Sequence, residues 1–266
     1  MNASFPLLLH LDGREIVADC GSTQDLCRIR AREGAPEGTV VQALAQTAGR
    51  GREARSWHSP PGLGLYVSIL LRPRADSARW PALTPLLSLA LAESLEELAS
   101  SRPAAALKRW NTSIKWPNDL YGERGKLAGV LAETEGTAVV AGIGLNLAQV
   151  EGDFPPALSG RASSLVLEGF APAPDAAAVL EALNHRLTRA YAAFQNGTME
   201  FLREGLLRRF RLRGARVTVA AGGTLVQGTA VDLGGLGELI LDTPGGRRSI
   251  LAGEAVEVEP GPEVGP

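Results

Sequence analysis

Residues 115–133 read KWPNDLYGERGKLAGVLAE. This stretch joins two polar clusters that each begin with a lysine, KWPND and KLAG, to the run AGVLAE, whose apolar character is typical of a strand. Comparable runs occur at 5–11 (FPLLLHL), 39–45, 64–71 and 137–147. Because these runs are mixed with helical patterns, we expect residues 1–213 to form an α/β or α+β domain.

Three long helices are expected within this domain. After Pro81, leucines recur at steps of three and four residues from Leu83 to Leu98, which predicts one buried helical face. A second helix follows Pro174 and ends at Asn196-Gly197, and a third runs from Thr198 to about Arg213.

From residue 214 the pattern changes to short strands separated by glycine pairs. The expected strands are 215–221, 225–233, 237–243, 247–252 and 254–258. Such closely spaced strands indicate a small antiparallel barrel or meander. A unit of roughly 50 residues has a thin core, so we expect residues 214–266 to lean on the larger domain.

Composition excludes several classes of protein. The chain has 266 residues, a formal net charge of -2, two cysteines and three histidines, without a spacing that suits zinc or a disulfide framework. No basic leader precedes the first apolar run, which argues against a signal peptide. The longest helix-like apolar stretch, 80–100, carries Glu93, Glu96 and Glu97, which argues against a membrane span. We therefore expect a cytoplasmic protein with no membrane partner and no resident metal.

Residues 49–57, GRGREARSW, suggest an anion site. The glycines indicate a loop whose backbone approaches a ligand closely, and Arg50, Arg52 and Arg55 indicate that the ligand is negatively charged. The best-known nucleotide signatures are absent. Leu120 stands where a P-loop before Gly125-Lys126 would need its first glycine, and the GIG at 142–144 lacks the third glycine of a dinucleotide fingerprint.

Four blocks occur together in order: GRGREARSW, SPPGLGLYVSILLRP at 59–73, KWPNDLYGERGKLAGVLAE, and GIGLNL at 142–147. Over most of residues 18–147 the chain resembles the catalytic core of biotin protein ligases, and ASSL at 162–165 and the terminal β module resemble that family's layout. The resemblance implies an α+β fold with a mixed sheet, related to class II aminoacyl-tRNA synthetases and followed by a small SH3-like β-barrel. Because a strand is expected within the opening residues, we expect no helix-turn-helix there and no DNA partner.

The same resemblance implies a two-step ligase reaction. Biotin and ATP, with Mg²⁺, give biotinyl-5′-AMP and pyrophosphate, and a lysine of a biotin carboxyl carrier protein, as in acetyl-CoA carboxylase, then takes the biotin. A carboxylate must attack the α-phosphate of a polyanion in the first step, which requires fixed cations. The resemblance also allows a homodimer.

The resemblance assigns site residues one by one. The catalytic residues are Lys126, Arg52 and Arg50. The residues expected to bind biotin are Ser22, Thr23, Gln24, Gln46, Arg50, Gly51, Arg52 and Lys126. The residues expected to bind ATP are Arg52, Trp57, Lys115, Asn118, Asp119 and Lys126, with Asp119 also placed to help hold Mg²⁺ through phosphate or water.

Simpler roles compete with several of these assignments. Ser22 and Asp25 also form a capping box before a helix at 26–31, and Trp57 also suits a hydrophobic core. Two positions depart from the family's pattern. Gln24 stands where asparagine is common, and Ala54 replaces a common glycine, which predicts a stiffer loop.

Two other functions stay open. Lipoate ligases share the expected fold, although KWPND and GRGR favour biotin; the related acyl transferases need a cysteine after the lysine motif, and none follows Cys27. An RNA-binding module is a non-catalytic alternative. A net charge of -2, with only three tyrosines and six phenylalanines, argues against it.

Overall fold

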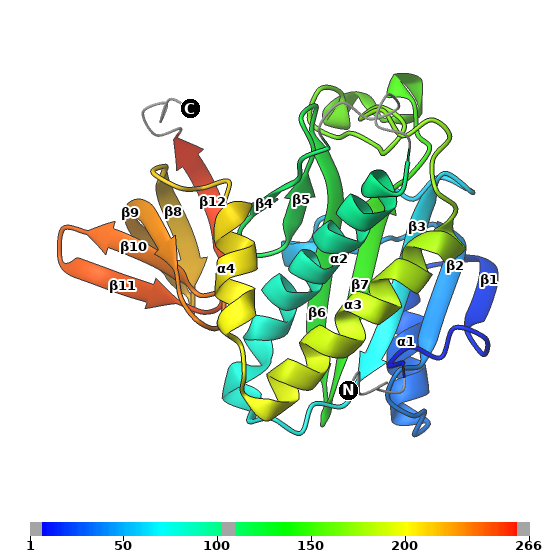
Figure 1. Cartoon of the computed structure of the whole chain (residues 1–266), viewed down its shortest axis with the longest axis horizontal. Coiled ribbons are helices and arrows are strands. Elements are labelled where there is room, and N and C mark those ends of the chain that lie inside the picture. The colour runs from blue at the N-terminus through cyan, green and yellow to red at the C-terminus, as the bar shows by residue number, and fades with distance from the viewer. Residues whose placement is uncertain (1–6, 103–109, 260–266) are drawn as a thin grey trace.

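A seven-stranded mixed sheet forms the centre of the molecule (Figure 1). The computed structural model describes residues 7–102 and 110–259. The strand order is β1-β2-β3-β7-β6-β5-β4. The bounds are Glu15–Cys20 (β1), Val40–Gln46 (β2), Gly64–Leu71 (β3), Ser113–Lys115 (β4), Asp119–Tyr121 (β5), Lys126–Glu135 (β6) and Ala138–Asn146 (β7). Among the strands of this sheet in the described residues, β1 and β2 are the pair that runs in parallel, because helix α1 (Thr23–Arg32) makes the crossover between them.

Helices cover the two faces of this sheet unequally. Helices α2 (Leu83–Ser100) and α3 (Ala176–Asn196) lie together over one face (Figure 1), where Val139, Ala141 and Ile143 of β7 join the main core. The alternate residues Ala138 and Val140 pack with Cys27 of α1 in a separate cluster. Since successive side chains of a strand point to opposite faces, α1 covers the other face. That face of β7 continues as Gly142 and Gly144, and the room that these glycines leave is taken by the side chains of Gln24 and Trp57.

The C-terminal residues form a second, five-stranded antiparallel sheet. Its order is β11-β10-β9-β8-β12. The bounds are Arg216–Ala221 (β8), Thr224–Leu233 (β9), Leu239–Thr243 (β10), Gly246–Ile250 (β11) and Glu254–Glu259 (β12). Since β11 and β12 are the two end strands of this order, closure into a barrel stays a prediction.

The small sheet leans on the larger one, as expected. Buried residues of both sheets belong to one continuous hydrophobic cluster, which includes Val217 and Leu239. Helix α4 (Glu200–Arg208) stands between α2 and the small sheet (Figure 1), and its Arg203 pairs with Asp232 of β9 at 2.8 Å. Trp116 donates from Nε1 to the carbonyl oxygen of Gly237, 2.9 Å away, at the junction of the sheets.

Most of the predicted elements are confirmed, and two expectations are wrong. The described part of 5–11 is not a strand, because the amide nitrogens of Leu8 and Leu9 donate to Thr188 and Asn184 of α3 instead of a neighbouring strand; residues 5 and 6 lie outside the described residues. The first strand in the described residues is β1, which has no fully buried residue and therefore lacks the apolar run that would have predicted it. Helix α4 ends at Arg208, five residues before the expected end at Arg213, where the chain turns toward β8.

None of the helices in the described ranges is both long enough and apolar enough to cross a bilayer.

We predict that Trp116→Phe lowers the free energy of unfolding by about 1–2 kcal/mol, because it leaves the Gly237 carbonyl without its donor. Urea denaturation followed by circular dichroism measures this change. Trp110→Phe is the matched control, since the Trp110 Nε1 is buried without a hydrogen-bond partner among the described residues. Equal losses in the two variants would show that the bond to Gly237 adds nothing.

Candidate functional site

A cavity of about 660 Å³ lies beside the start of α1, and Gly142 and Gly144 of β7 form part of its wall. Every residue that the sequence assigned to catalysis, biotin or ATP lines this one cavity. These residues are Ser22, Thr23, Gln24, Gln46, Arg50, Gly51, Arg52, Trp57, Lys115, Asn118, Asp119 and Lys126. They come from the start of α1, the end of β2, the loop after it, strands β4, β5 and β6, and the turn between β4 and β5.

One end of the cavity is built from neutral hydrogen-bonding groups. The Gln46 side chain accepts from the backbone nitrogen of Thr23 at 2.9 Å and donates to Ser59 Oγ, also at 2.9 Å. The Thr23 hydroxyl lies 2.8 Å from Ser68 Oγ, which donates to Gln24 Oε1 at 2.9 Å. This chain of amides and hydroxyls fixes the rotamers of buried polar side chains.

Gln24 is held mainly by the protein itself. Its Nε2 donates to Glu133 Oε2 at 3.0 Å and to the Leu131 carbonyl oxygen at 3.3 Å. The backbone of the same helix start uses Ser22 as its N-cap, with Ser22 Oγ accepting from the Gln24 nitrogen at 3.3 Å. The capping role of Ser22 is therefore confirmed.

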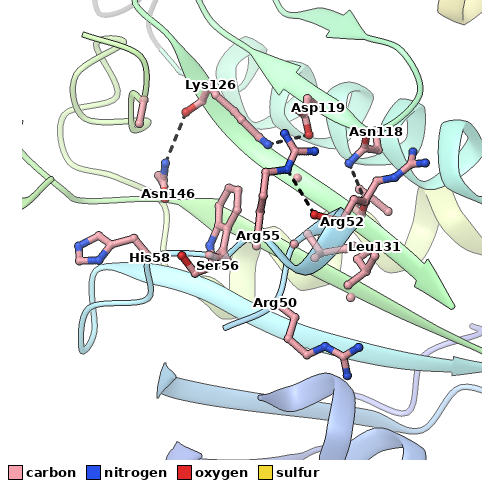
Figure 2. Close-up of a pocket in the computed structure, with 18 of the residues that line it drawn as sticks. Arg50, Arg52, Arg55, Ser56, His58, Asn118, Asp119, Lys126, Leu131 and Asn146 are labelled. Carbon is pink, nitrogen blue, oxygen red and sulfur yellow. Dashed lines mark hydrogen bonds and ion pairs between the residues drawn. The ribbon is translucent and has the colours of Figure 1, made fainter. Parts of the chain in front are cut away.

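The other end of the cavity gathers cations. Lys126 Nζ lies 2.7 Å from Asp119 Oδ1 and 5.3 Å from the centre of the Trp57 ring. Figure 2 shows the guanidinium of Arg55 directed toward the end of the cavity where this Lys126–Asp119 pair lies. Asn118 turns its Nδ2 to the Val130 carbonyl oxygen at 3.0 Å, so its own oxygen is available as an acceptor.

Burial disfavours the charged forms of two of these cations in the ligand-free protein. Desolvation lowers the pKa of Arg52 from its ordinary value, and Glu254 is the largest opposing influence. Desolvation also lowers the pKa of Lys115, against the attraction of Asp119, and the positive charge of Lys126 lowers it further. Groups that are poorly solvated and mutually repelling favour a bound anion.

Arg50 points away from these cations. Its guanidinium donates to Asp25 Oδ1 at 2.7 Å and to Glu133 Oε1 at 3.2 Å, and Figure 2 shows it directed toward the helix below the loop. Asp25 therefore pairs with the loop, whereas the sequence had placed it in a capping box. Arg50 lines the cavity while its charge is held by two carboxylates.

The loop that carries the arginines is a small hairpin with unusual backbone angles. The Trp57 nitrogen donates to the Gly49 carbonyl at 2.8 Å, and the Gly51 nitrogen donates to the Arg55 carbonyl at 2.7 Å. Glu53 and Ala54 at its tip have φ values of 52° and 56°, in the left-handed region that glycine adopts most easily. Ala54 therefore adds local strain to the stiffness that the sequence predicted.

Trp57 forms part of the cavity wall because glycines make room for it. A β-carbon at Gly144 would lie 2.5 Å from Trp57 Cε2, and one at Gly129 would lie 3.1 Å from Trp57 Cζ3. The Trp57 Nε1 is buried without a hydrogen-bond partner among the described residues. An unpaired donor in a cavity wall is available to a ligand.

Several residues that line or support the site were not assigned from the sequence, among them Arg55 and Ser68. Arg55 lines the cavity at its cationic end, and its place in the arginine-rich loop was the available signal. Ser68 links Thr23 to Gln24, and the signal was a hydroxyl within the apolar run GLYVSILL.

Comparison with known proteins places the chain in a family. Residues 21–148 match the Biotin/lipoate A/B protein ligase family, and residues 214–256 match the Biotin protein ligase C terminal domain. A biotin--[acetyl-CoA-carboxylase] ligase of Mycobacterium tuberculosis is 34% identical over 247 residues, which are 92% of this chain and 88% of that protein. This chain belongs to the biotin protein ligase family.

Other members of the biotin protein ligase family match over shorter or longer parts. The bifunctional ligase/repressor BirA of Bacillus subtilis is 40% identical over 149 residues, which are 54% of this chain and 43% of that protein, so the match spans under half of this relative. A solved structure of biotin protein ligase from Aquifex aeolicus in complex with biotin and ATP superposes with a TM-score of 0.75 and 28% identity, covering 92% of this chain and 98% of that chain.

We predict that Gly144→Ala displaces the Trp57 indole from the cavity wall, because the new β-carbon would overlap the ring. Tryptophan fluorescence and near-ultraviolet circular dichroism of the ligand-free protein should both change, with a lower melting temperature. Gly152→Ala is the control, since a β-carbon at Gly152 meets nothing within 4 Å. Spectra identical to those of the unsubstituted protein would contradict this placement of Trp57.

Proposed function

We propose that this chain activates biotin with ATP to biotinyl-5′-AMP and transfers the biotin to a lysine of a biotin carboxyl carrier protein. The observation that carries the proposal is the difference in polarity between the two ends of this cavity. Neutral amides and hydroxyls line one end, where Thr23 and Gln46 lie, and cations line the other, where Lys126 and Arg52 lie. A neutral ureido ring and a triphosphate need these two environments at the two ends of one site.

The neutral end is proposed to bind the ureido ring of biotin. Thr23 and Gln46 supply a hydroxyl and an amide whose orientations are fixed by Ser68 and Ser59. Ser22 and Gln24 lie beside them; since the Gln24 amide already binds Glu133 and Leu131, we assign Gln24 the role of shaping this end. Gly51 brings backbone groups to the cavity without a side chain in the way.

The cationic end is proposed to bring the biotin carboxylate and the α-phosphate together. Lys126 can release Asp119 and contact both anions, which offsets their repulsion while charge builds at phosphorus. Arg52 is proposed to retain the adenylate, with Lys115 on the phosphate side and Trp57 and Asn118 near adenine. Arg50 is proposed to act by fixing the loop, through Asp25 and Glu133.

Mg²⁺ is proposed to enter with the nucleotide, as part of the substrate. The described residues contain no cluster of three or more side chains that could hold a metal ion. Of the described residues that line the cavity, Asp119 alone is a carboxylate, so phosphate oxygens and water would supply the other ligands. The ion would neutralise part of the triphosphate charge and favour departure of pyrophosphate.

The lysine of the acceptor would then attack the carbonyl of the adenylate, and AMP would leave. The related protein of Mycobacterium tuberculosis is named for acetyl-CoA carboxylase, which makes a carrier domain of that enzyme the acceptor we propose. Residues 1–213 are proposed as the catalytic domain and residues 214–266 as a C-terminal β domain. A homodimer stays a prediction.

We predict that the protein mixed with ATP, Mg²⁺ and biotin forms a species with the mass of biotinyl-5′-AMP, and that lipoate gives far less acyl-adenylate. Mass spectrometry of the acid-quenched mixture measures both products. A dominant lipoyl adenylate would assign the site to lipoate, and no acyl-adenylate with either acid would overturn the proposed function.

We predict that Lys126→Ala lowers the rate of adenylate formation on the order of 10²-fold or more, because the two anions lose their shared cation. Pyrophosphate release in the presence of biotin measures the rate. Arg124→Ala removes an exposed cation two residues away, paired only distantly with Glu151 at 4.0 Å, and should leave the rate unchanged. A near-normal rate in Lys126→Ala would remove Lys126 from the reaction.

A further inference from the structure

The arginine loop is held at its tip by the C-terminal sheet. Arg52 Nη2 donates to the carbonyl oxygen of Gly253 at 2.7 Å. The next residue, Glu254 at the start of β12, forms an ion pair with Arg55 Nη2 through its Oε1. Two adjacent residues of the small sheet therefore contact two arginines that lie about 200 residues earlier in the chain.

The charge of Glu254 is not explained by the sheet in which it lies. Glu254 pairs across the sheet with Ala220, a residue that offers no partner to a carboxylate. Glu254 is only 9% exposed, and its Oε2 has no hydrogen-bond partner among the described residues. Burying a carboxylate is costly unless cations compensate it. The cations that interact electrostatically with this carboxylate are Arg52, Arg55 and Lys115.

The contact with Glu254 leaves one nitrogen of the Arg55 guanidinium available to a ligand. The Arg55 Nε donates to the Arg52 carbonyl at 3.3 Å, and its Nη2 is taken by Glu254. Within the described ranges, its Nη1 has no partner. Two of the three guanidinium nitrogens are thus fixed and the third remains, on a side chain directed toward the end of the cavity that holds Lys126 and Asp119 (Figure 2). A guanidinium fixed in this way presents a pre-oriented donor to an anion.

We propose that Glu254 is a positioning residue for the nucleotide, which holds the Arg55 guanidinium at the phosphate side of the cavity. The inference rests on the proposed function and names a residue of the C-terminal sheet for it. The Arg55 side chain is 61% exposed, so without Glu254 it would be free to take many rotamers. Fixing it before ATP binds reduces the entropy that binding must overcome.

The test compares Glu254→Ala and Glu254→Gln with Glu259→Gln, a change at an exposed position of the same strand. Calorimetric titration of each full-length protein with MgATP and, separately, with biotin gives two dissociation constants. We expect Glu254→Ala to raise the Kd for ATP on the order of tenfold and to change the Kd for biotin less than about twofold. Glu254→Gln, which keeps an acceptor oxygen, should be intermediate, and Glu259→Gln should match the unsubstituted protein.

Amide exchange of the ligand-free proteins gives a second readout. Faster exchange at 52–57 in Glu254→Ala, with unchanged exchange in α3, would support the proposed contact. Unchanged ATP affinity with a lower melting temperature would make Glu254 a structural residue only, and tighter ATP binding would make it a competitor of phosphate. Either result would overturn the inference.

Different results would contradict the proposed function and the proposed role of Glu254. If the unsubstituted protein binds ATP and forms biotinyl-5′-AMP but the Glu254 variants bind ATP equally well, the proposed function stands and the inference falls. If the unsubstituted protein binds ATP yet makes no adenylate, the proposed function falls, and the ratio of ATP dissociation constants still tests Glu254. If it binds no ATP, both fall.

Discussion

Repulsion among cations gathered at one end of a partly buried cavity limits how this site can be built. Lys115, Lys126, Arg52 and Arg55 converge at one end, and burial lowers the pKa of Lys115 and Arg52. Such a group is stable without ligand only if nearby carboxylates offset part of its charge. The chain supplies one from each sheet, Asp119 from the large sheet and Glu254 from the small one.

This balance shows why the two sheets need to be packed together. The loop after β2 crosses the cavity, and its arginines are anchored on both sides: Arg50 reaches α1 and β6, whereas Arg52 and Arg55 reach the start of β12. The anchors also hold the left-handed residues at the tip of the loop. The continuous core between the sheets and the bond from Trp116 to Gly237 keep the second anchor in place. The small sheet thus forms part of the site.

Much of the site was predictable because the residues that act on a ligand lie in short local blocks. GRGREARSW, KWPND and KLAG each place charged groups beside glycine or a strand end, and those groups do meet in one cavity. The blocks did not reveal where each arginine points. Arg50 and Arg55 lie in the same short run of the sequence, yet the first pairs with Asp25 and Glu133 and the second is directed toward the cationic end of the cavity. Only distant residues distinguish them.

Elements whose hydrophobic residues recur at a regular spacing could be predicted from the sequence alone. Strands β2, β3, β6 and β7 and helices α2 and α3 follow from local hydrophobic patterns. Tertiary structure decided the segment at 7–11, which binds α3, and the contacts of Ser68 and Glu254. The physical reason is that periodicity reports burial of neighbours along the chain, whereas a hydrogen bond or ion pair depends on which distant segments folding brings together.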